Sequence, residues 1–183
     1  MKWTIDTAHS EINFSARHMM ISTVRGQFEK FSGSVDFNEN DPSRSEVEVQ
    51  IDASSINTRE PQRDGHLKSP DFLDVEKYPY ITFKSNKIEV KDDEHALITG
   101  DLTIRDITRK VVLETHFAGL AKSPYGTTNA GFSASTRINR KDWGLVWNVA
   151  LETGGVLVSD EIKIDIDLEI IKQAEGELEA VLA

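Results

Sequence analysis

Residues 161–171 read EIKIDIDLEII, and they are the most regular stretch of the chain. Apolar side chains stand at every even position from Ile162 to Ile170, and charged side chains stand between them. A period of two over this length predicts a β-strand with one buried face and one solvated face. The chain is therefore expected to be built from strands that separate an apolar interior from water.

Similar alternation recurs along most of the remaining sequence. The other expected strands cover residues 3–5, 10–18, 26–37, 46–52, 80–90, 97–105, 109–120 and 128–139. Residues 3–5 are short and are expected at a sheet edge, and slips in phase after Phe28 and Phe83 predict bends or bulges. About eight long strands with one polar face each predict an all-β, antiparallel, eight-stranded barrel. A barrel of this size is either filled by side chains or holds one slender ligand, and the pattern leaves both open.

Residues 56–79 interrupt the strands without any alternation. A connection longer than about 12–15 residues usually folds into structure of its own or serves a function. Asn57 begins a capping-box spacing, and Ser69 precedes a proline, which is a common helix start. We therefore expect a helical insertion of two short helices, at residues 59–68 and 70–74.

The first expected helix carries a cationic stripe. Its members share one face by the spacing of three and four residues, and they are Arg59, Arg63, His66 and Leu67. Two interpretations stay open. The charges form surface ion pairs with Asp71 or Asp74, or Arg63 and His66 face the barrel mouth and hold an anionic or hydroxylated head group.

A second unusual connection, residues 141–158, reads KDWGLVWNVALETGGVLV. Connecting loops are normally polar because they lie in water, yet this one contains Trp143, Trp147 and several aliphatic residues. We expect it to fold over a barrel mouth. The domain is expected to span residues 1–172, followed by an acidic, helical C-terminal tail at residues 173–183.

Composition limits the function classes. The 183 residues suit one domain, and 31 acidic against 21 basic residues give a net charge of −10. This balance argues against a generic nucleic-acid surface or anionic-membrane surface, since both need clustered Lys and Arg. The absence of cysteine excludes disulfides and thiolate metal sites. No signal peptide or membrane-spanning run is recognisable, so we expect a cytoplasmic protein without stable membrane insertion, or a periplasmic one if the chain is a processed form. Exposed strand edges would suit a homodimer.

The five histidines have no spacing typical of a zinc site, and no metal or cofactor is expected. His95 and His116 are expected on the outside. His18 shares the apolar face of its strand and has three open interpretations: a core histidine, a contact for a ligand's polar end, or a metal ligand. A hydrolase using His18 or His66 with Asp64 is an alternative, although no nucleophile-elbow motif marks one.

Short blocks spread in order over almost the whole chain carry a family pattern. They are Trp3-Thr4-Ile5-Asp6, His9-Ser10, Phe14, His18, Val24, Gly26, Phe28, Arg63-Asp64, His66-Leu67, Ser69, Asp71-Phe72, Tyr78-Pro79, Phe83, Ser85, Gly100, Leu102-Thr103-Ile104, Thr108, Gly131-Phe132, Arg140 and Trp143-Gly144. Together they resemble the YceI-like, polyisoprenoid-binding proteins. The resemblance implies a lipocalin-like barrel whose elongated hydrophobic pore takes a long-chain isoprenoid or similar lipid. It also implies binding, carriage or storage of that lipid rather than catalysis.

This resemblance suggests a ligand site. We expect His18, Arg63 and His66 at the polar end of the ligand. The expected wall residues are Phe14, Phe28, Phe72, Phe83, Leu102, Phe132, Trp143 and Trp147. A plain core would explain the same aromatic residues. A filled barrel that acts as a protein-interaction module is therefore a further alternative.

Overall fold

The computed structural model describes residues 2–172, so the expected tail at residues 173–183 lies outside the described residues. The strands are β1 (Lys2–Ile5), β2 (Glu11–His18), β3 (Ser22–Phe28), β4 (Phe31–Asp36), β5 (Glu46–Asp52), β6 (Ile56–Asn57), β7 (Tyr80–Val90), β8 (His95–Ile104), β9 (Ile107–Lys122), β10 (Thr128–Asn139) and β11 (Glu161–Lys172). The helices are α1 (Pro61–Lys68) and the short 3-10 helices η1 (Thr7–His9), η2 (Pro42–Arg44), η3 (Ala53–Ser55) and η4 (Arg140–Trp143). None of these helices is long and apolar enough to cross a membrane.

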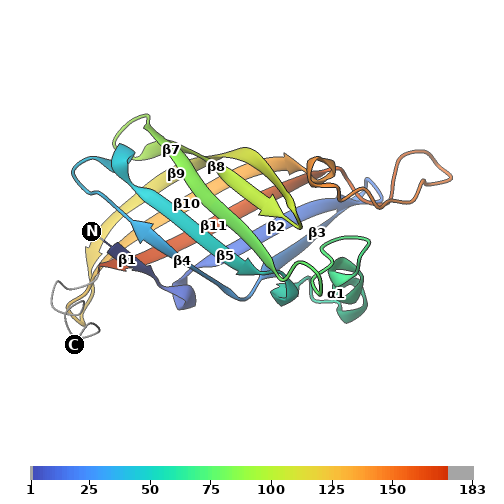
Figure 1. The fold of residues 1–183 in the computed structure, drawn as a ribbon, viewed down its shortest axis with the longest axis horizontal. Helices are drawn as coiled ribbons and strands as arrows, with labels where there is room; N and C mark the ends of the chain where they lie inside the picture. Colours follow the sequence, from blue (N-terminus) through green and yellow to red (C-terminus); the bar gives the residue numbers. More distant parts are fainter. Residues whose placement is uncertain (1, 173–183) are drawn as a thin grey trace.

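The strands form one closed antiparallel barrel (Figure 1). β1 and β2 follow one another along β11, β3 and β4 lie opposite them, and β5 and β6 continue the next strand. These three interrupted strands and the five strands β7 to β11 make the expected eight-stranded barrel. Closure comes from β1, which pairs with both β4 and β11. The expectation that residues 3–5 form an edge strand is therefore wrong, because barrel closure gives both sides of β1 a partner.

Alternation located most strands closely. β5, β7 and β10 have the expected bounds, and the slip after Phe28 is the break between β3 and β4. The slip after Phe83 is a register shift between Ser85 and Lys87, where β7 pairs with β8. The strand bounds and the two irregularities follow from one rule: a strand around one interior places every second side chain inward, so the sequence pattern shifts where the strand breaks or changes register.

The insertion contains one helix rather than two. Helix α1 begins at Pro61, and the Glu60 carboxylate caps it by accepting hydrogen bonds from the backbone N–H groups of Gln62 and Arg63. The expected helix at residues 70–74 is a series of turns. There the N–H groups of Phe72 and Asp74 both donate to the Ser69 carbonyl, so the hydrogen bonds converge on one residue and no helical ladder forms.

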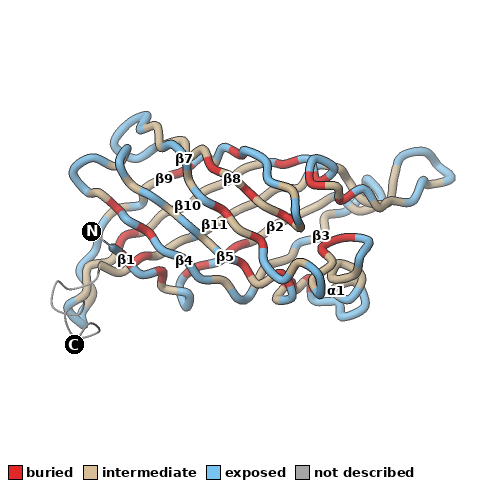
Figure 2. The backbone as a smooth tube through the Cα atoms, in the orientation of Figure 1, coloured by how far each residue is buried: buried red, intermediate tan, exposed pale blue. Residues whose placement is uncertain are grey.

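The two ends of the barrel are built differently. We call the end that carries α1 and residues 141–160 the helix end, and the opposite end, where β1 begins and β11 finishes, the terminal end (Figure 1). Short turns at residues 37–45, 91–94 and 123–127 make up the terminal end. The buried residues lie mainly along the strands, whereas the outermost loops at both ends are exposed (Figure 2).

Candidate ligand-binding cavity

A cavity of about 1180 Å³ runs along the inside of the barrel. Its wall includes His66 and Trp147 at the helix end and Glu39 and Asp92 at the terminal end. Ligand pockets commonly measure about 300–1,000 Å³, so this interior has room for a large ligand. The barrel is hollow, which decides between the two interiors that the alternating pattern left open.

The middle of the wall is almost entirely apolar. Inward residues of β11 from Ile162 to Leu168 line it, together with their counterparts on the other strands, while the charged residues between them face outward. Gly100 shapes one part of this wall. An added Cβ there would come within 2.4 Å of the Phe83 ring, so the missing side chain lets that ring lie flat against β8.

Polar groups line the helix end of the cavity, and Arg63 is held in place among them. Its Nε donates to Thr58 Oγ1 at 2.7 Å, and its Nη2 donates to the Thr58 carbonyl at 2.6 Å. Asp64 accepts a hydrogen bond from the backbone N–H of Thr58 at 2.8 Å. Thr58 thus orients the guanidinium at the cavity, and the expected ion pair of Arg63 with Asp71 or Asp74 does not form within residues 2–172. Arg59 is exposed and does not line the cavity.

His66 joins the two segments that build the helix end. Its Nε2 lies 2.9 Å from a carboxylate oxygen of Asp71, as the surface ion-pair interpretation expected. Its ring also stands edge-on to Phe72 and Trp147, with centroids 5.1 and 4.5 Å away. The hydrolase alternative paired Asp64 with His18 or His66. Asp64 accepts hydrogen bonds from Thr58, and the His66–Asp64 pair is not formed among the described residues.

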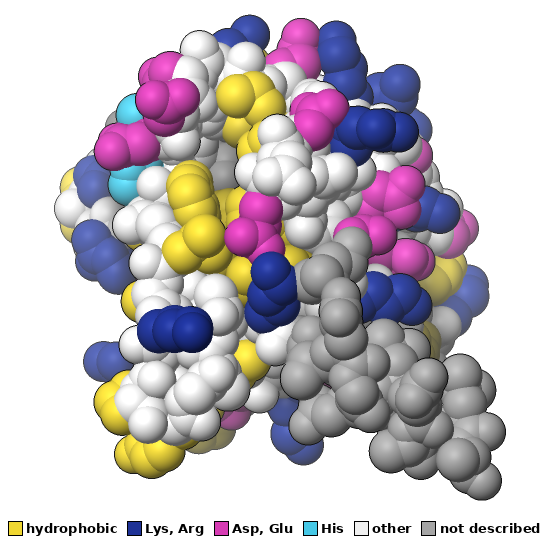
Figure 3. All heavy atoms as spheres, turned by 90° about the vertical axis from the view of Figure 1, so that its left-hand side faces the viewer, with side chains coloured by type: hydrophobic (Ala, Val, Ile, Leu, Met, Phe, Trp, Pro, Cys, Tyr) yellow, Lys and Arg dark blue, Asp and Glu magenta, His cyan; other side chains and the backbone are white. Residues whose placement is uncertain are grey.

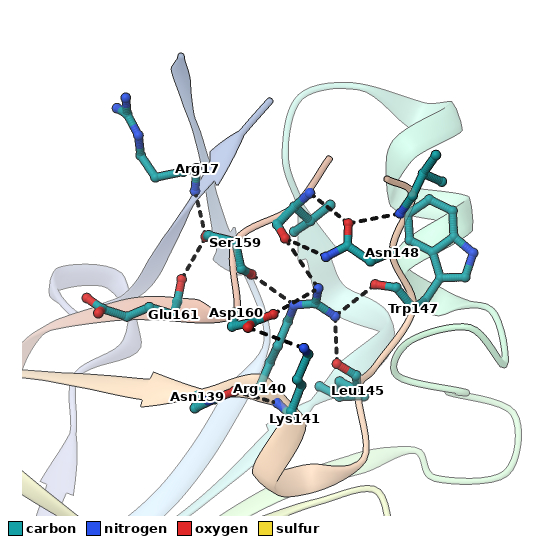
Figure 4. A network of polar contacts seen from close by, with 12 residues as sticks. Arg17, Asn139, Arg140, Lys141, Leu145, Trp147, Asn148, Ser159, Asp160 and Glu161 are labelled. Carbon is teal, nitrogen blue, oxygen red and sulfur yellow. Dashed lines mark hydrogen bonds and ion pairs between the residues drawn. The ribbon is translucent and has the colours of Figure 1, made fainter. Parts of the chain in front are cut away.

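Arg140 anchors residues 141–160 over this end (Figure 4). Its side chain is 3% exposed, and it donates to the carbonyl oxygens of Leu145, Trp147, Val158 and Ser159 at 2.6–3.4 Å. Burial lowers the pKa of the guanidinium, an effect that Asp160 opposes at 3.9 Å. The sequence analysis noted Arg140 only as part of a family block. The role of Arg140 could have been inferred from its position in the sequence, where an alternating strand meets an apolar loop.

Most expected ligand residues line the cavity. They are His18, Arg63, His66, Phe14, Phe28, Phe72, Phe83, Leu102, Phe132 and Trp147. Trp143 does not line it, which corrects the expected wall. Its indole is 2% exposed and donates from Nε1 to the Leu102 carbonyl at 2.9 Å, so it belongs to the packed core. Contact of the other residues with a ligand remains a prediction.

The terminal end of the cavity is acidic. Glu39, Asp92, Asp93 and Glu94 line it together with His95. Asp92 accepts hydrogen bonds from the N–H groups of Glu94 and His95 at 2.9 and 2.8 Å and from the His95 ring, and these bonds lower the pKa of its carboxyl. At this end apolar side chains lie near the middle with charged groups around them (Figure 3).

Aromatic rings form the floor inside this acidic rim. Phe37 lies 5.8 Å from Phe117 and 5.3 Å from Phe132 between ring centroids, and all three line the cavity. Trp3 packs edge-on against Phe37 at 5.6 Å and is 2% exposed. Residues 91–94 lie between two of the expected strands, and their place at the cavity was not predicted, since alternation does not say which turns meet at one end.

One group of possible metal ligands occurs among residues 2–172, and it lies away from the cavity wall. Asp6, His9 and Glu169 bring their ligand atoms within 4.8 Å of one another. The Asp6 carboxylate already bonds to His9 Nδ1 at 2.8 Å, which lowers the pKa of Asp6 and raises that of His9. This exposed pairing caps the short helix η1 and contributes nothing to the cavity.

Comparisons with known proteins agree on a family. The YceI-like domain family pattern matches residues 3–170. UPF0312 protein SA2479 of Staphylococcus aureus is 38% identical over 168 residues, which are 91% of this chain and 95% of that protein. The crystal structure of the Campylobacter jejuni YCEI protein superposes with a TM-score of 0.77 at 33% identity, covering 86% of this chain and 90% of that one. A polyisoprenoid binding domain from Saccharophagus degradans shares the fold at a TM-score of 0.70 and 16% identity, covering 92% and 97%.

Proposed function

Because the chain belongs to the YceI-like domain family, we propose that it binds a long-chain isoprenoid or a similar lipid without catalysis, and that it carries or stores this lipid. The observation that carries the proposal is the cavity of about 1180 Å³, whose middle is apolar and whose polar groups gather at its two ends. The relative from Saccharophagus degradans is described as polyisoprenoid-binding, which supports the same class of ligand here.

The shape of the cavity favours an elongated ligand. Strand β10 has 12 residues, and at about 3.4 Å per residue and a tilt near 40° it spans roughly 30 Å along the barrel axis. Each CH₂ group moved from water into this wall gains about 0.8 kcal/mol. The apolar chain of the lipid therefore supplies most of the binding free energy, and the head group determines which way round the lipid lies in the cavity.

The charges at the two ends favour one orientation. Arg63 and His66 line the helix end together with Glu60, whose carboxylate accepts hydrogen bonds from the first turn of α1. Asp92, Asp93 and Glu94 line the terminal end. Thr58 occupies Nε and Nη2 of Arg63, and no partner for Nη1 is recorded among the described residues. An anionic or hydroxylated head group would accept a hydrogen bond there, and an anionic one would also be repelled by the carboxylates at the other end. We assign the head group to the helix end.

The test is whether the protein carries lipid. Protein purified from cells is extracted with organic solvent, and the extract is analysed by mass spectrometry. The proposal expects about one long-chain lipid per chain, or uptake of an added polyprenol or quinone. Finding neither bound lipid nor uptake would contradict it.

A pair of substitutions ties that binding to the cavity. Ala134 lines the middle of the wall on β10, so Ala134→Trp places an indole inside the lipid's path. We expect lipid binding to fall at least tenfold. Val112 is 45% exposed on β9 and does not line the cavity, so Val112→Trp is the control and should bind as the parent protein does. Equal binding by both variants would place the lipid outside the barrel.

A further inference from the structure

Large apolar side chains stand exposed on two loops of the helix end. Met19, Met20 and Ile21 form the turn between β2 and β3 and are 38%, 56% and 74% exposed. Val146 and Val149, in residues 141–160, are 62% and 47% exposed. Single exposed apolar residues are ordinary, but five around one end of a cavity form a patch that water solvates poorly.

The two loops form one surface. The backbone N–H of Met19 donates to the Leu157 carbonyl at 2.8 Å, and the N–H of Leu157 donates to the Val149 carbonyl at 2.9 Å. A Cβ added to Gly155 would lie 3.2 Å from Cγ of Met20, so the Met20 side chain also lies close to the base of residues 150–156. Residues 150–156 project beyond the barrel, and the β2–β3 turn lies beside their base (Figure 1).

The backbone of this turn makes its methionines unexpected. Met19 and Met20 have φ angles of +51° and +63°, in the left-handed region that favours Asn and Gly. A tight turn between two strands with these angles is normally made by Asn-Gly. Folding alone would thus favour small polar residues here. Two long apolar side chains in their place point to a contact that the isolated protein does not satisfy.

Charge distinguishes this end from the other. Arg17, near the end of β2, lines the cavity, and its guanidinium bonds to the turn and to β3: Nη1 donates to Thr23 Oγ1 at 3.0 Å and Nη2 to the Met20 carbonyl at 3.3 Å. Asp160 is already paired with Lys141 at 3.3 Å, and within residues 141–160 the carboxylates of Asp142 and Glu152 have no ion pair among the described residues. The terminal end instead presents the carboxylates of residues 92–94, which an anionic bilayer would repel.

We propose that this patch is a membrane-contact surface: Met19, Met20, Ile21, Val146 and Val149 enter the interface of an anionic bilayer while Arg17 meets its phosphates. The inference rests on the proposed function, since a ligand with a long apolar chain resides in bilayers and has to cross from there into the barrel. Docking of the helix end brings the cavity mouth to the lipid without exposing the chain to water. The contact is reversible, because a few side chains bury too little area for stable anchoring.

Vesicle co-sedimentation tests the surface, with vesicles of phosphatidylcholine containing phosphatidylglycerol. The key variant is Met19→Asn with Met20→Gly, which suits the turn's φ angles and should fold with an equal or higher Tm. We expect its vesicle partitioning to fall at least tenfold. The control is Tyr125→Ser, which removes a 93% exposed ring at the terminal end and should partition as the parent does. Equal partitioning of parent and key variant, or no partitioning of the parent, would overturn the proposal.

Two further measurements separate this inference from its alternatives. Sedimentation analysis without lipid reports whether the patch joins two copies of the chain, and a parent dimer that the key variant abolishes would overturn the membrane assignment. Uptake of a polyprenol from dilute ethanol needs no docking to a membrane, so the key variant should take up the polyprenol from ethanol as the parent does. Transfer of the polyprenol from vesicles to the key variant should slow at least tenfold. If the parent takes up no lipid from ethanol, the proposed function fails, whereas vesicle partitioning reports on the surface by itself.

Discussion

The two ends of the barrel share one wall but differ in how they are closed and charged. At the helix end, α1 and residues 141–160 meet through contacts of His66 with Phe72 and Trp147, and the cationic groups Arg17 and Arg63 line the cavity. At the terminal end, short turns hold four carboxylates around a floor of phenylalanine rings. The strands form a cavity that does not favour either orientation of a ligand, and the loops at the two ends make the orientations unequal.

The difference also appears in what stabilises each end. The helix end depends on a single buried cation, because Arg140 gathers the carbonyl groups of residues 145–159. The terminal end depends on local bonds such as those that Asp92 accepts within its own turn. Substitutions at the two ends should therefore differ in which property they change and in how large the change is.

The largest effect is expected from Arg140→Met. The change removes the Arg140 donor from four carbonyl groups, of which that of Val158 keeps a hydrogen bond from Asn148 at 2.8 Å. Breaking a buried charged network of this kind costs about 3–5 kcal/mol. Urea unfolding measures the change in the free energy of unfolding. Arg137→Met is the matched control, since Arg137 lies on β10 just before η4 and is a 64% exposed ion-pair partner of Glu161 on β11. It should cost no more than about 1 kcal/mol. Equal costs for both variants would contradict the anchoring role of Arg140.

A moderate effect is expected from Arg63→Gln on ligand affinity. If the head group lies at the helix end, the variant should bind a long-chain fatty acid about tenfold more weakly, or about 1.4 kcal/mol, because a charge-assisted hydrogen bond is lost. The fatty alcohol of equal length should lose much less. Dissociation constants from calorimetry measure both, with the exposed Arg59→Gln as control. Equal losses for acid and alcohol would show that Arg63 acts only through its bonds to Thr58.

The smallest effect is expected from Asp92→Asn and depends on pH. Hydrogen bonds from Glu94 and His95 lower the folded-state pKa of Asp92, so its contribution to stability is present above the unfolded-state pKa, near 4. That contribution is lost as the pH falls through the lowered folded-state value. The parent should therefore have the higher Tm at pH 7, and the gap should close below about pH 4. A gap that widens in acid would contradict this role for Asp92.

The sequence predicted the wall of the barrel well because one physical rule governs it. Every strand faces the same interior, so alternation located β5, β7 and β10 with their bounds. It also placed Phe14, Phe83 and residues 162, 164, 166 and 168 of β11 on the cavity side. The same rule predicted the breaks in β3–β4 and β7 from slips in phase. Alternation could not predict that the barrel closes through β1, since the pairing of β1 with β11 joins residues at opposite ends of the chain.

The ends were predicted less well because long-range contacts decide the paths of loops. Trp143 was expected on the cavity wall, but its indole finds the carbonyl of Leu102, 41 positions earlier in the chain, and is buried in the core. The turns after Ser69 replaced a helix for a local reason, since the N–H of Leu73 donates to the carbonyl of Leu67, six residues earlier. Nor did any local pattern indicate that Asp92 and Glu39 would meet at one cavity end.

The central claim is that a long-chain lipid lies inside the barrel with its head group at the helix end. A crystal structure of the protein loaded with a long-chain fatty acid that carries bromine on its last carbon tests both parts at once. The account predicts an anomalous bromine peak near Phe37, Phe117 and Phe132, with the carboxylate near Arg63. A bromine peak beside Arg63 would contradict the orientation, and a loaded crystal without bromine in the cavity would contradict the binding site itself.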